Sequence, residues 1–182
     1  MLVYKAFEPG LICRGYKFKE GVPNTTKEAN CRSNGFHAAE NPLDCLSYYD
    51  WDKGVFYACN AAGDIDEDHI DSKISCTVLT PLYQLSLTHF LLRAITYIVS
   101  HPLRENTHVQ RDKADITKGF AVVRGKDPIV RGELGCYFAL ARERATAEHI
   151  KDVALFKIDG KEYKPGVWYG VDGEVSRDED KP

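Results

Sequence analysis

Short apolar runs separated by glycine and proline recur along the chain, and this pattern predicts a series of β-strands. Over residues 2–18 the runs are broken by Pro9-Gly10 and Gly15, which favours a hairpin or two short strands. A polar loop is expected to follow, because turn-forming residues replace the apolar ones. Further strands are expected at residues 35–38, 55–61, 73–79, 120–123, 129–130, 134–140 and 153–158, with a hairpin from Asp159-Gly160 into 162–164.

Two segments have the periodicity of helices. The longer one, in the middle of the chain, repeats apolar residues at helical spacing on one face: Leu87, Phe90, Leu91, Ala94, Ile95 and Ile98. Pro81 is expected to open this helix and His101-Pro102 to end it. The shorter helix would begin with Asn41 as N-cap and Pro42 in the first position, and end near Trp51. We therefore predict an α+β fold, with mostly antiparallel strands and one long central amphipathic helix.

Length and composition are those of a small globular protein. The 182 residues are 43% hydrophobic and 28% charged, which excludes disorder for the bulk of the chain. We expect a single compact domain over 1–182, with an N-terminal lobe at about 1–101, a β-rich C-terminal lobe at about 117–176 and a frayed tail. The most apolar segment contains Gln84, His89 and Arg93, so it predicts a core helix rather than a membrane span.

Charge is distributed unevenly along the chain. The formal net charge of -3 excludes a protein that coats nucleic acid through global positive charge. Basic residues outnumber acidic ones in 1–32 and 104–131, whereas acidic residues are in excess in 64–71 and 172–180. The basic segments would suit a phosphate backbone if they share one face, and an ordinary mixed surface is the alternative. The residues expected to bind RNA or a partner are Lys17, Lys19, Arg32, Tyr48, Arg124, Lys126 and Arg131.

The six cysteines form no C-x-x-C pair, so the sequence does not indicate a zinc knuckle or a thioredoxin-like site. The chain does not begin with a basic region followed by an apolar run, so no secretory signal is expected. We expect reduced, mostly buried cysteines in a cytoplasmic protein. Two cysteines, Cys13 and Cys136, are candidate nucleophiles, and Arg14 beside Cys13 would lower the pKa of its thiol. The alternative is that both are packed in the core.

Two blocks of the sequence resemble an uncharacterised family that is common in phages and prophages. The first block contains C-R-G-Y-x-F at 13–18 and G-F-H-A-x-x-N-P-L-D-C-L-x-Y-Y at 35–49, and the second contains K-P-G-V-W-Y at 164–169. As a whole, the sequence is similar to the anti-CRISPR proteins of mobile elements and looks like a type II-A inhibitor directed at Cas9. The resemblance implies a partner, the Cas9–guide RNA complex, and a location in the cytoplasm of a bacterial host cell.

The acidic segment 64–71 suggests metal chemistry. It does not match a calcium loop, because His69 stands where such a loop needs glycine and Ser75 where it needs glutamate. A metal-dependent nuclease fits better, since Asp71-x-Lys73 at the start of a strand places a carboxylate and an ammonium on one face. Asp44 or Asp64 would supply a second carboxylate. On this hypothesis Asp64 and Asp71 bind Mg²⁺, and the alternative is an acidic turn between two strands.

A metal-independent ribonuclease is the second chemical hypothesis. Such an enzyme uses a histidine to deprotonate the 2′-hydroxyl and cations to stabilise the pentacoordinate phosphorane. His37, Arg14, Tyr48 and Lys73 carry the required groups, although a structural histidine at the end of a strand is the alternative. The candidate catalytic residues are therefore Arg14, His37, Asp71 and Lys73.

The functional prediction is an inhibitor of CRISPR-Cas immunity that acts on the Cas9–guide RNA complex, as an endoribonuclease that cleaves the guide RNA or provokes its cleavage. One alternative is a stoichiometric Cas9-binding mimic of nucleic acid, with the acidic segment 64–71 in place of phosphates. A further alternative is an ADP-ribosyltransferase-like enzyme that would use Arg14 and Glu133. No membrane partner is expected, and the sequence leaves the oligomeric state open.

Overall fold

The structure is a computed structural model that describes residues 1–67, 70–144 and 149–176. Of these residues 48% lie in strands and 12% in helices, so the protein is mostly β. The predicted α+β fold with a long central helix is therefore wrong. The chain divides into two compact units, unit 1 (Met1–Phe90) and unit 2 (Leu91–Pro182), each with its own sheet. The expectation of a single domain stays a prediction, and the tail expected to fray, 177–182, lies outside the described residues.

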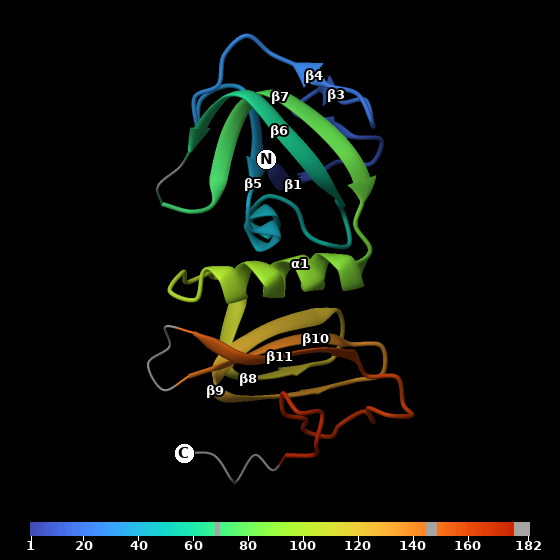
Figure 1. Cartoon of the computed structure of the whole chain (residues 1–182). Coiled ribbons are helices and arrows are strands. Elements are labelled where there is room, and N and C mark those ends of the chain that lie inside the picture. Colours follow the sequence, from blue (N-terminus) through green and yellow to red (C-terminus); the bar gives the residue numbers. More distant parts are fainter. Residues whose placement is uncertain (68–69, 145–148, 177–182) are drawn as a thin grey trace. The chain divides into compact units, whose positions relative to one another are not determined.

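Unit 1 contains a small antiparallel sheet that closes on itself (Figure 1). Its order is β4-β7-β5-β1-β6, and β6 and β7 also pair with each other along most of their length, so that β1 and β5 complete a barrel-like ring. The elements of unit 1 are β1 (Leu2–Phe7), β2 (Ile12–Cys13), β3 (Tyr16–Lys17), β4 (Asn24–Thr25), β5 (Phe36–Ala39), the 3-10 helix η1 (Pro42–Ser47), β6 (Val55–Glu67) and β7 (Lys73–Gln84).

The interior of this ring is apolar. One residue in two along β1 and β5 points inward, as the alternation of a strand requires. The core consists of buried side chains from β1, β5, β6 and β7, together with Phe18, which follows β3. Among them are Val3, Phe7, Phe36, Ala38, Tyr57, Cys59, Ala61, Ile74, Cys76 and Leu79. Lys5 lies between Val3 and Phe7 in this alternation and is also buried.

The helix α1 (Leu87–Ser100) is shorter than expected because β7 does not end at Pro81. Pro81 lies opposite Cys59, next to an irregularity in the β6–β7 register, where the ladder tolerates a residue without an N–H donor. Ser86 caps the helix, since its carbonyl accepts from Phe90 N at 2.8 Å. The predicted apolar face is confirmed: Phe90, Leu91, Ala94, Ile95 and Ile98 are all buried.

The start of the shorter helix is also confirmed. Asn41 Oδ1 accepts a hydrogen bond from Leu43 N at 3.1 Å, and Pro42 occupies the first helical position. The helix is a six-residue 3-10 helix that ends at Ser47, and so it does not extend to Trp51.

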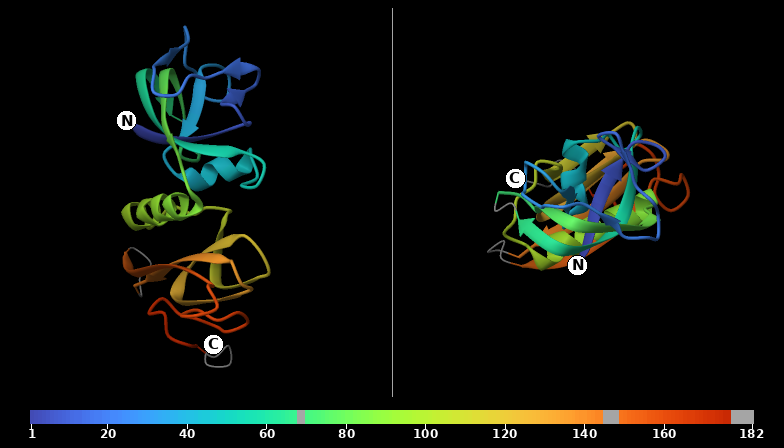
Figure 2. Two further views of the ribbon diagram at one scale, coloured as in Figure 1. Left: turned by 90° about the vertical axis from the view of Figure 1, so that its right-hand side faces the viewer. Right: turned by 90° about the horizontal axis from the view of Figure 1, so that it is seen from above.

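Most strand pairs among the described residues are antiparallel, as predicted, and unit 2 contains the exceptions. Its sheet has the order β11-β10-β9-β8, and both β8–β9 and β9–β10 are parallel (Figures 1 and 2). Only β10–β11 is antiparallel among the described strands of this sheet. The strands are β8 (Val109–Ile116), which the sequence did not indicate, β9 (Phe120–Gly132), β10 (Tyr137–Glu143) and β11 (Ile150–Lys157).

The expected hairpin at Asp159-Gly160 is wrong as well. Asp159 Oδ1 accepts from the backbone N–H groups of Lys161, Glu162 and Tyr163 at 2.8, 3.0 and 3.1 Å, so the carboxylate organises a turn without a following strand. The core of unit 2 lies against one face of the sheet and includes Val123, Val130, Phe138, Leu140, Phe156 and Ile158.

Candidate functional site

A cavity of about 580 Å³ opens into unit 1. It lies where the ring of strands is least complete, because β1 and β5 share a single register pair, Tyr4 with Ala39. The hairpin β2–β3, the loop before β5, the helix η1 and the start of β7 complete its walls. The ionisable residues that line it are mainly basic: Lys5, Arg14, Arg32, His37 and Lys73, with Asp44 as the acidic exception among the described residues.

Lys5 is the most buried of these charges, with 8% of its surface exposed. Its Nζ donates to the carbonyl oxygen of His37 at 2.6 Å and lies 5.5 Å and 5.8 Å from the ring centroids of Phe7 and Phe18. No carboxylate in the described part of the chain forms an ion pair with it. An ammonium has three N–H donors, so Lys5 brings a positive charge and two further donors to the cavity.

His37 lies among the cations of the cavity as a neutral imidazole. Burial lowers its pKa below 6.5, and the charges of Lys5, Lys73 and Arg14 lower it further. Its Nε2 is 3.0 Å from the backbone N of Arg32. Because a backbone N–H can only donate, Nε2 must be the acceptor, and the ring proton is on Nδ1. In this state His37 can donate a hydrogen bond, but it has no free lone pair with which to act as a base.

Lys73 and Asp71, two residues apart, point to different partners. Lys73 Nζ donates to the hydroxyl of Tyr48 and lies 4.5 Å from the centroid of that ring. Asp71 Oδ1 accepts from Lys73 N at 2.8 Å, and Oδ2 is 3.6 Å from a guanidinium nitrogen of Arg32. The Asp71-x-Lys73 pair therefore forms a turn at the start of β7, and only Lys73 of the two lines the cavity.

Arg14 is presented to the cavity by the tight turn of the hairpin β2–β3. Cys13 pairs with Tyr16, and the two residues between them, Arg14 and Gly15, have φ values of 48° and 78°. Two positive φ values in a two-residue connection match the twist of a hairpin, and the glycine adopts one of them without steric cost. The signal for this turn, Arg-Gly between short apolar runs, is visible in the sequence.

Aromatic rings cover part of the cavity wall. Tyr16 is 42% exposed, and its ring centroid is 4.6 Å from that of Phe18 and 5.1 Å from that of Phe36. Tyr48, which also lines the cavity, is 58% exposed. Exposed rings beside cations are suited to stacking on nucleobases, whose π-faces are common to all four bases.

The predicted Mg²⁺ ligands, Asp64 and Asp71, make separate contacts in the structure. Asp64 is exposed on β6, and its backbone N donates to Thr77 Oγ1 at 2.9 Å. Asp71 instead contacts Lys73 N, and Thr77 and Lys73 are four strand residues apart, about 13 Å along β7. Residues 68 and 69 lie outside the described part of the chain, and within that part no group of three His, Cys, Asp or Glu side chains could hold a metal. Mg²⁺ binding stays a prediction.

Four of the six cysteine side chains are buried, as expected. Burial raises the pKa of the Cys136 thiol, which opposes a nucleophilic role. Cys13 lines the cavity, where its sulfur is 3.7 Å from the hydroxyl of Tyr49. Burial, with the contact to Cys13, raises the pKa of Tyr49 to about 12.

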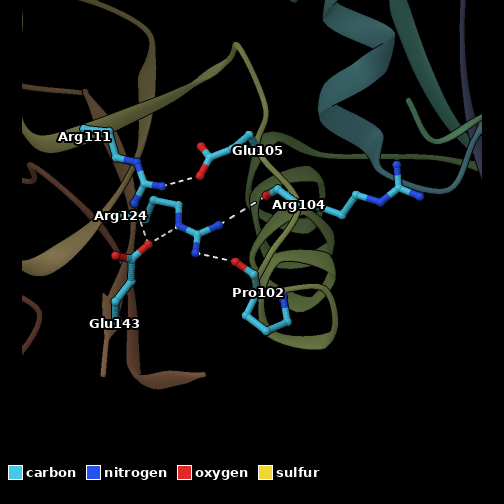
Figure 3. Close-up of polar contacts among 6 residues, drawn as sticks. All are labelled: Pro102, Arg104, Glu105, Arg111, Arg124 and Glu143. Atoms are coloured by element: carbon cyan, nitrogen blue, oxygen red, sulfur yellow. Dashed lines mark hydrogen bonds and ion pairs between the residues drawn. The ribbon is translucent and has the colours of Figure 1, made fainter. Parts of the chain in front are cut away.

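Arg124 in unit 2 is not a surface residue, contrary to its predicted part in RNA binding. Its side chain is 2% exposed and lies between a carboxylate and two carbonyl groups (Figure 3). Nε donates to Glu143 Oε1 at 2.5 Å, Nη1 to the carbonyl of Arg104 at 3.2 Å and Nη2 to that of Pro102 at 2.6 Å. Arg111 donates to the same Glu143 oxygen at 2.5 Å. Arg124 therefore ties the segment after α1 to the sheet.

The other predicted RNA-binding residues are dispersed. Lys17 and Lys19 are exposed on the hairpin side of unit 1, outside the cavity lining, and Lys126 is exposed on β9. Arg131 donates to Asp115 and lies 4.7 Å from the centroid of the Trp168 ring. Of the basic residues predicted for binding, only Arg32 lies in the cavity, together with the candidate catalytic residues Arg14, His37 and Lys73.

Lys5 is the site residue that the sequence analysis missed. The available signal was a lysine on the inward face of an otherwise apolar strand, in the run V-Y-K-A-F. A lysine in such a position is nearly always paired when it is buried, so it marks either an ion pair or a ligand site.

Comparison with known proteins places the chain in a family. Residues 1–93 match a family described as a domain of unknown function (DUF7666), and the chain belongs to it. The matched residues include every residue that lines the cavity. No curated protein and no solved structure matches the chain. Within the described residues, α1 falls short of the length and apolarity of a membrane-crossing helix.

Proposed function

We propose that unit 1 binds RNA through its cationic cavity, and that the protein inhibits CRISPR-Cas immunity by engaging the guide RNA of Cas9. The observation that supports RNA binding is the gathering of Lys5, Arg14, Arg32 and Lys73 around one cavity beside exposed aromatic rings. The guide RNA is the target that the resemblance to type II-A anti-CRISPR proteins suggests. Such an inhibitor would act in the cytoplasm of the bacterial host cell.

The chemistry of the cavity matches that of a nucleotide. Four cationic side chains and one carboxylate, Asp44, line the cavity, and Asp44 Oδ2 already accepts from Ser72 Oγ at 2.5 Å. Of the four cations, Arg32 also pairs with Asp71, which lies outside the lining. The remaining positive charge attracts phosphate, which supplies most of the affinity of proteins for nucleic acid. The rings of Tyr16 and Tyr48 offer stacking surfaces for bases.

The same geometry favours binding over strand cleavage. Cleavage without a metal needs a base that removes the proton of the 2′-hydroxyl. The only lone pair of the neutral His37 ring accepts from Arg32 N, so His37 would first have to lose that bond. The cations would stabilise a phosphorane, but the residues of the cavity supply a donor more readily than a base.

RNA binding is tested by fluorescence anisotropy with a labelled guide RNA. The variant Arg14→Gln/Lys73→Gln should weaken binding by at least about tenfold, since each lost charge-assisted hydrogen bond is worth roughly 1.5–3 kcal/mol. The matched control Lys17→Gln/Lys19→Gln removes the same charge from the same unit outside the cavity and should change affinity by less than about threefold. Equal losses in the two variants would contradict the cavity as the binding site.

Inhibition and RNA cleavage are tested together. Cas9 loaded with guide RNA should lose DNA cleavage when the protein is added, and the cavity variant should restore it. On a denaturing gel the guide RNA should stay intact, with Mg²⁺ or with EDTA. A discrete shortened RNA would show that the protein is a ribonuclease, and its sensitivity to EDTA would distinguish a metal site from the His37 group.

Mimicry of nucleic acid is a second candidate, favoured by the exposure of Asp64 and Glu67 at the end of β6. Asp66 contributes less, because its Oδ2 accepts from Cys31 N at 2.6 Å. Mimicry would be supported if the wild-type protein binds Cas9 in the absence of RNA and the variant Asp64→Asn/Glu67→Gln does not. The ADP-ribosyltransferase alternative gains no support, because Arg14 and Glu133 belong to different units.

A further inference from the structure

The charges that line the cavity differ in depth. Arg14 and Arg32 are exposed, Lys73 is half-buried, and Lys5 is 8% exposed. The positive charge therefore extends from the surface to the innermost part of the cavity. Binding to the flexible backbone of an RNA chain needs only the surface cations, so the position of Lys5 calls for a separate explanation.

The bond that Lys5 makes does not require a charge. Beyond the pair Tyr4–Ala39, β1 and β5 no longer pair, and the His37 carbonyl lacks a backbone donor from β1. Lys5 Nζ donates to this carbonyl oxygen instead, at 2.6 Å. A neutral donor would serve equally well, whereas a buried ammonium without a carboxylate partner costs free energy through lost hydration. An anionic ligand at the base of the cavity would offset that cost.

We propose that the base of the cavity binds a terminal phosphate monoester, so that unit 1 recognises a phosphorylated RNA end rather than an internal phosphodiester. This inference rests on the RNA binding proposed above. An internal phosphodiester carries nucleotides on both sides, and the chain would have to enter and leave the cavity. A volume of about 580 Å³ is that of a site for one small ligand.

The donors near Lys5 match a terminal phosphate in number and charge. Such a group has a charge of about −1.5 to −2 at neutral pH and three acceptor oxygens. Lys5 supplies two free N–H groups, and His37 supplies the N–H on Nδ1. Lys5, Lys73 and Arg14 line the same cavity as His37. Tyr16 would then stack on the terminal base.

The test compares three forms of one labelled oligoribonucleotide on the full chain, with a 5′-phosphate, with a 3′-phosphate or with hydroxyls at both ends. One phosphorylated form should bind at least about tenfold more tightly than the unphosphorylated form, and the preferred end identifies the polarity. In Lys5→Met the phosphorylated form should lose at least about tenfold more affinity than the unphosphorylated form, so that this preference vanishes. The exposed control Lys19→Met should keep the preference.

A competition experiment on the wild-type protein does not depend on the folding of any variant. A nucleoside monophosphate should displace the phosphorylated RNA at concentrations where the matching nucleoside does not. Equal affinity for the three RNA forms, or a preference that survives in Lys5→Met, would overturn the inference. If the RNA forms bind equally and Arg14→Gln/Lys73→Gln still weakens them, the proposed function stands without it. If no RNA binds, both proposals fail.

Discussion

Each unit buries a cation, and the two cations have very different partners. Arg124 in unit 2 is 2% exposed and has a carboxylate and two carbonyl groups around its guanidinium. Lys5 in unit 1 is 8% exposed and has one carbonyl group and two aromatic rings. The first charge is neutralised within the fold, and the second has no such partner among the described residues. Burial alone therefore does not separate a structural cation from a ligand-binding one, whereas the partner set does.

The largest effect is expected when the partner of Arg124 is removed. Glu143→Ala leaves a guanidinium buried without its carboxylate, and it should lower the unfolding free energy of unit 2 by about 3–5 kcal/mol. Urea denaturation monitored by Trp168 in a Trp51→Phe background reports on this unit. Glu105→Ala is the control, because Glu105 is 72% exposed and pairs with Arg111 at the surface. A similar loss in the control would remove the contrast between the two cations.

The second effect concerns the backbone that shapes the cavity. Gly35 has a φ of +87°, and a Cβ there would overlap Ser75 Oγ and lie 2.9 Å from Ala29 Cα. Gly35→Ala should therefore lower the unfolding free energy of unit 1 by about 2–3 kcal/mol, measured from Trp51 fluorescence.

Gly15→Ala separates the two causes of that loss. Gly15 has a φ of +78°, and a Cβ at this position would meet nothing within 4 Å, so the variant should show only the backbone cost, about 1 kcal/mol. Equal losses at both positions would mean that the contacts of Gly35 do not matter.

The comparison predicts a third, smaller effect at Lys5. Lys5→Met removes an unneutralised ammonium together with one donor to the His37 carbonyl. These changes oppose each other, so the unfolding free energy of unit 1 should change by less than about 1 kcal/mol or rise. Urea denaturation with Trp51 as the probe measures it. A loss as large as that of Glu143→Ala would show that Lys5 is a structural cation like Arg124.

The smallest effect is a pH dependence. The folded pKa of His37 is lowered, so between that value and 6.5 the unfolded chain binds more protons than the folded one. The stability of unit 1 should therefore fall as the pH falls below about 6.5, down to the folded pKa. Denaturation curves at a series of pH values should show this slope, and His37→Gln should reduce it.

Local signals predicted parts of the fold well. The Asn41-Pro42 start of η1 and the apolar face of α1 follow from neighbouring residues alone, and both are confirmed. The prediction that Pro81 opens the helix was wrong. Whether this proline starts a helix or lies at a strand irregularity depends on the pairing of β7 with β6. The strand β8 was missed because it is rich in charge and mostly exposed, so its conformation depends on the parallel pairing with β9 rather than on its own apolar pattern.

The residue types of the candidate site could be predicted from the sequence, but their hydrogen-bond partners and burial could not. Arg14, His37, Tyr48 and Lys73 were selected by residue type, and they line one cavity. The pairing of Nε2 with Arg32 N, which limits His37 to a donor, was not visible in the sequence. The burial of Arg124 could not be predicted from the sequence either, since an arginine in a strand is usually at the surface.

The amino-acid sequence alone determines which ionisable and aromatic side chains are present. It also determines the positions of local turns and helix caps, because these depend on residues a few positions apart. The inward position of Lys5 in the alternation of β1 follows in the same way. Which cations are neutralised is instead a property of the folded units, because the partners of Lys5 and Arg124 come from segments distant in the chain. A buried charge is stabilised or left open by the groups that the fold brings to it, and that balance separates a structural contact from a site for a ligand.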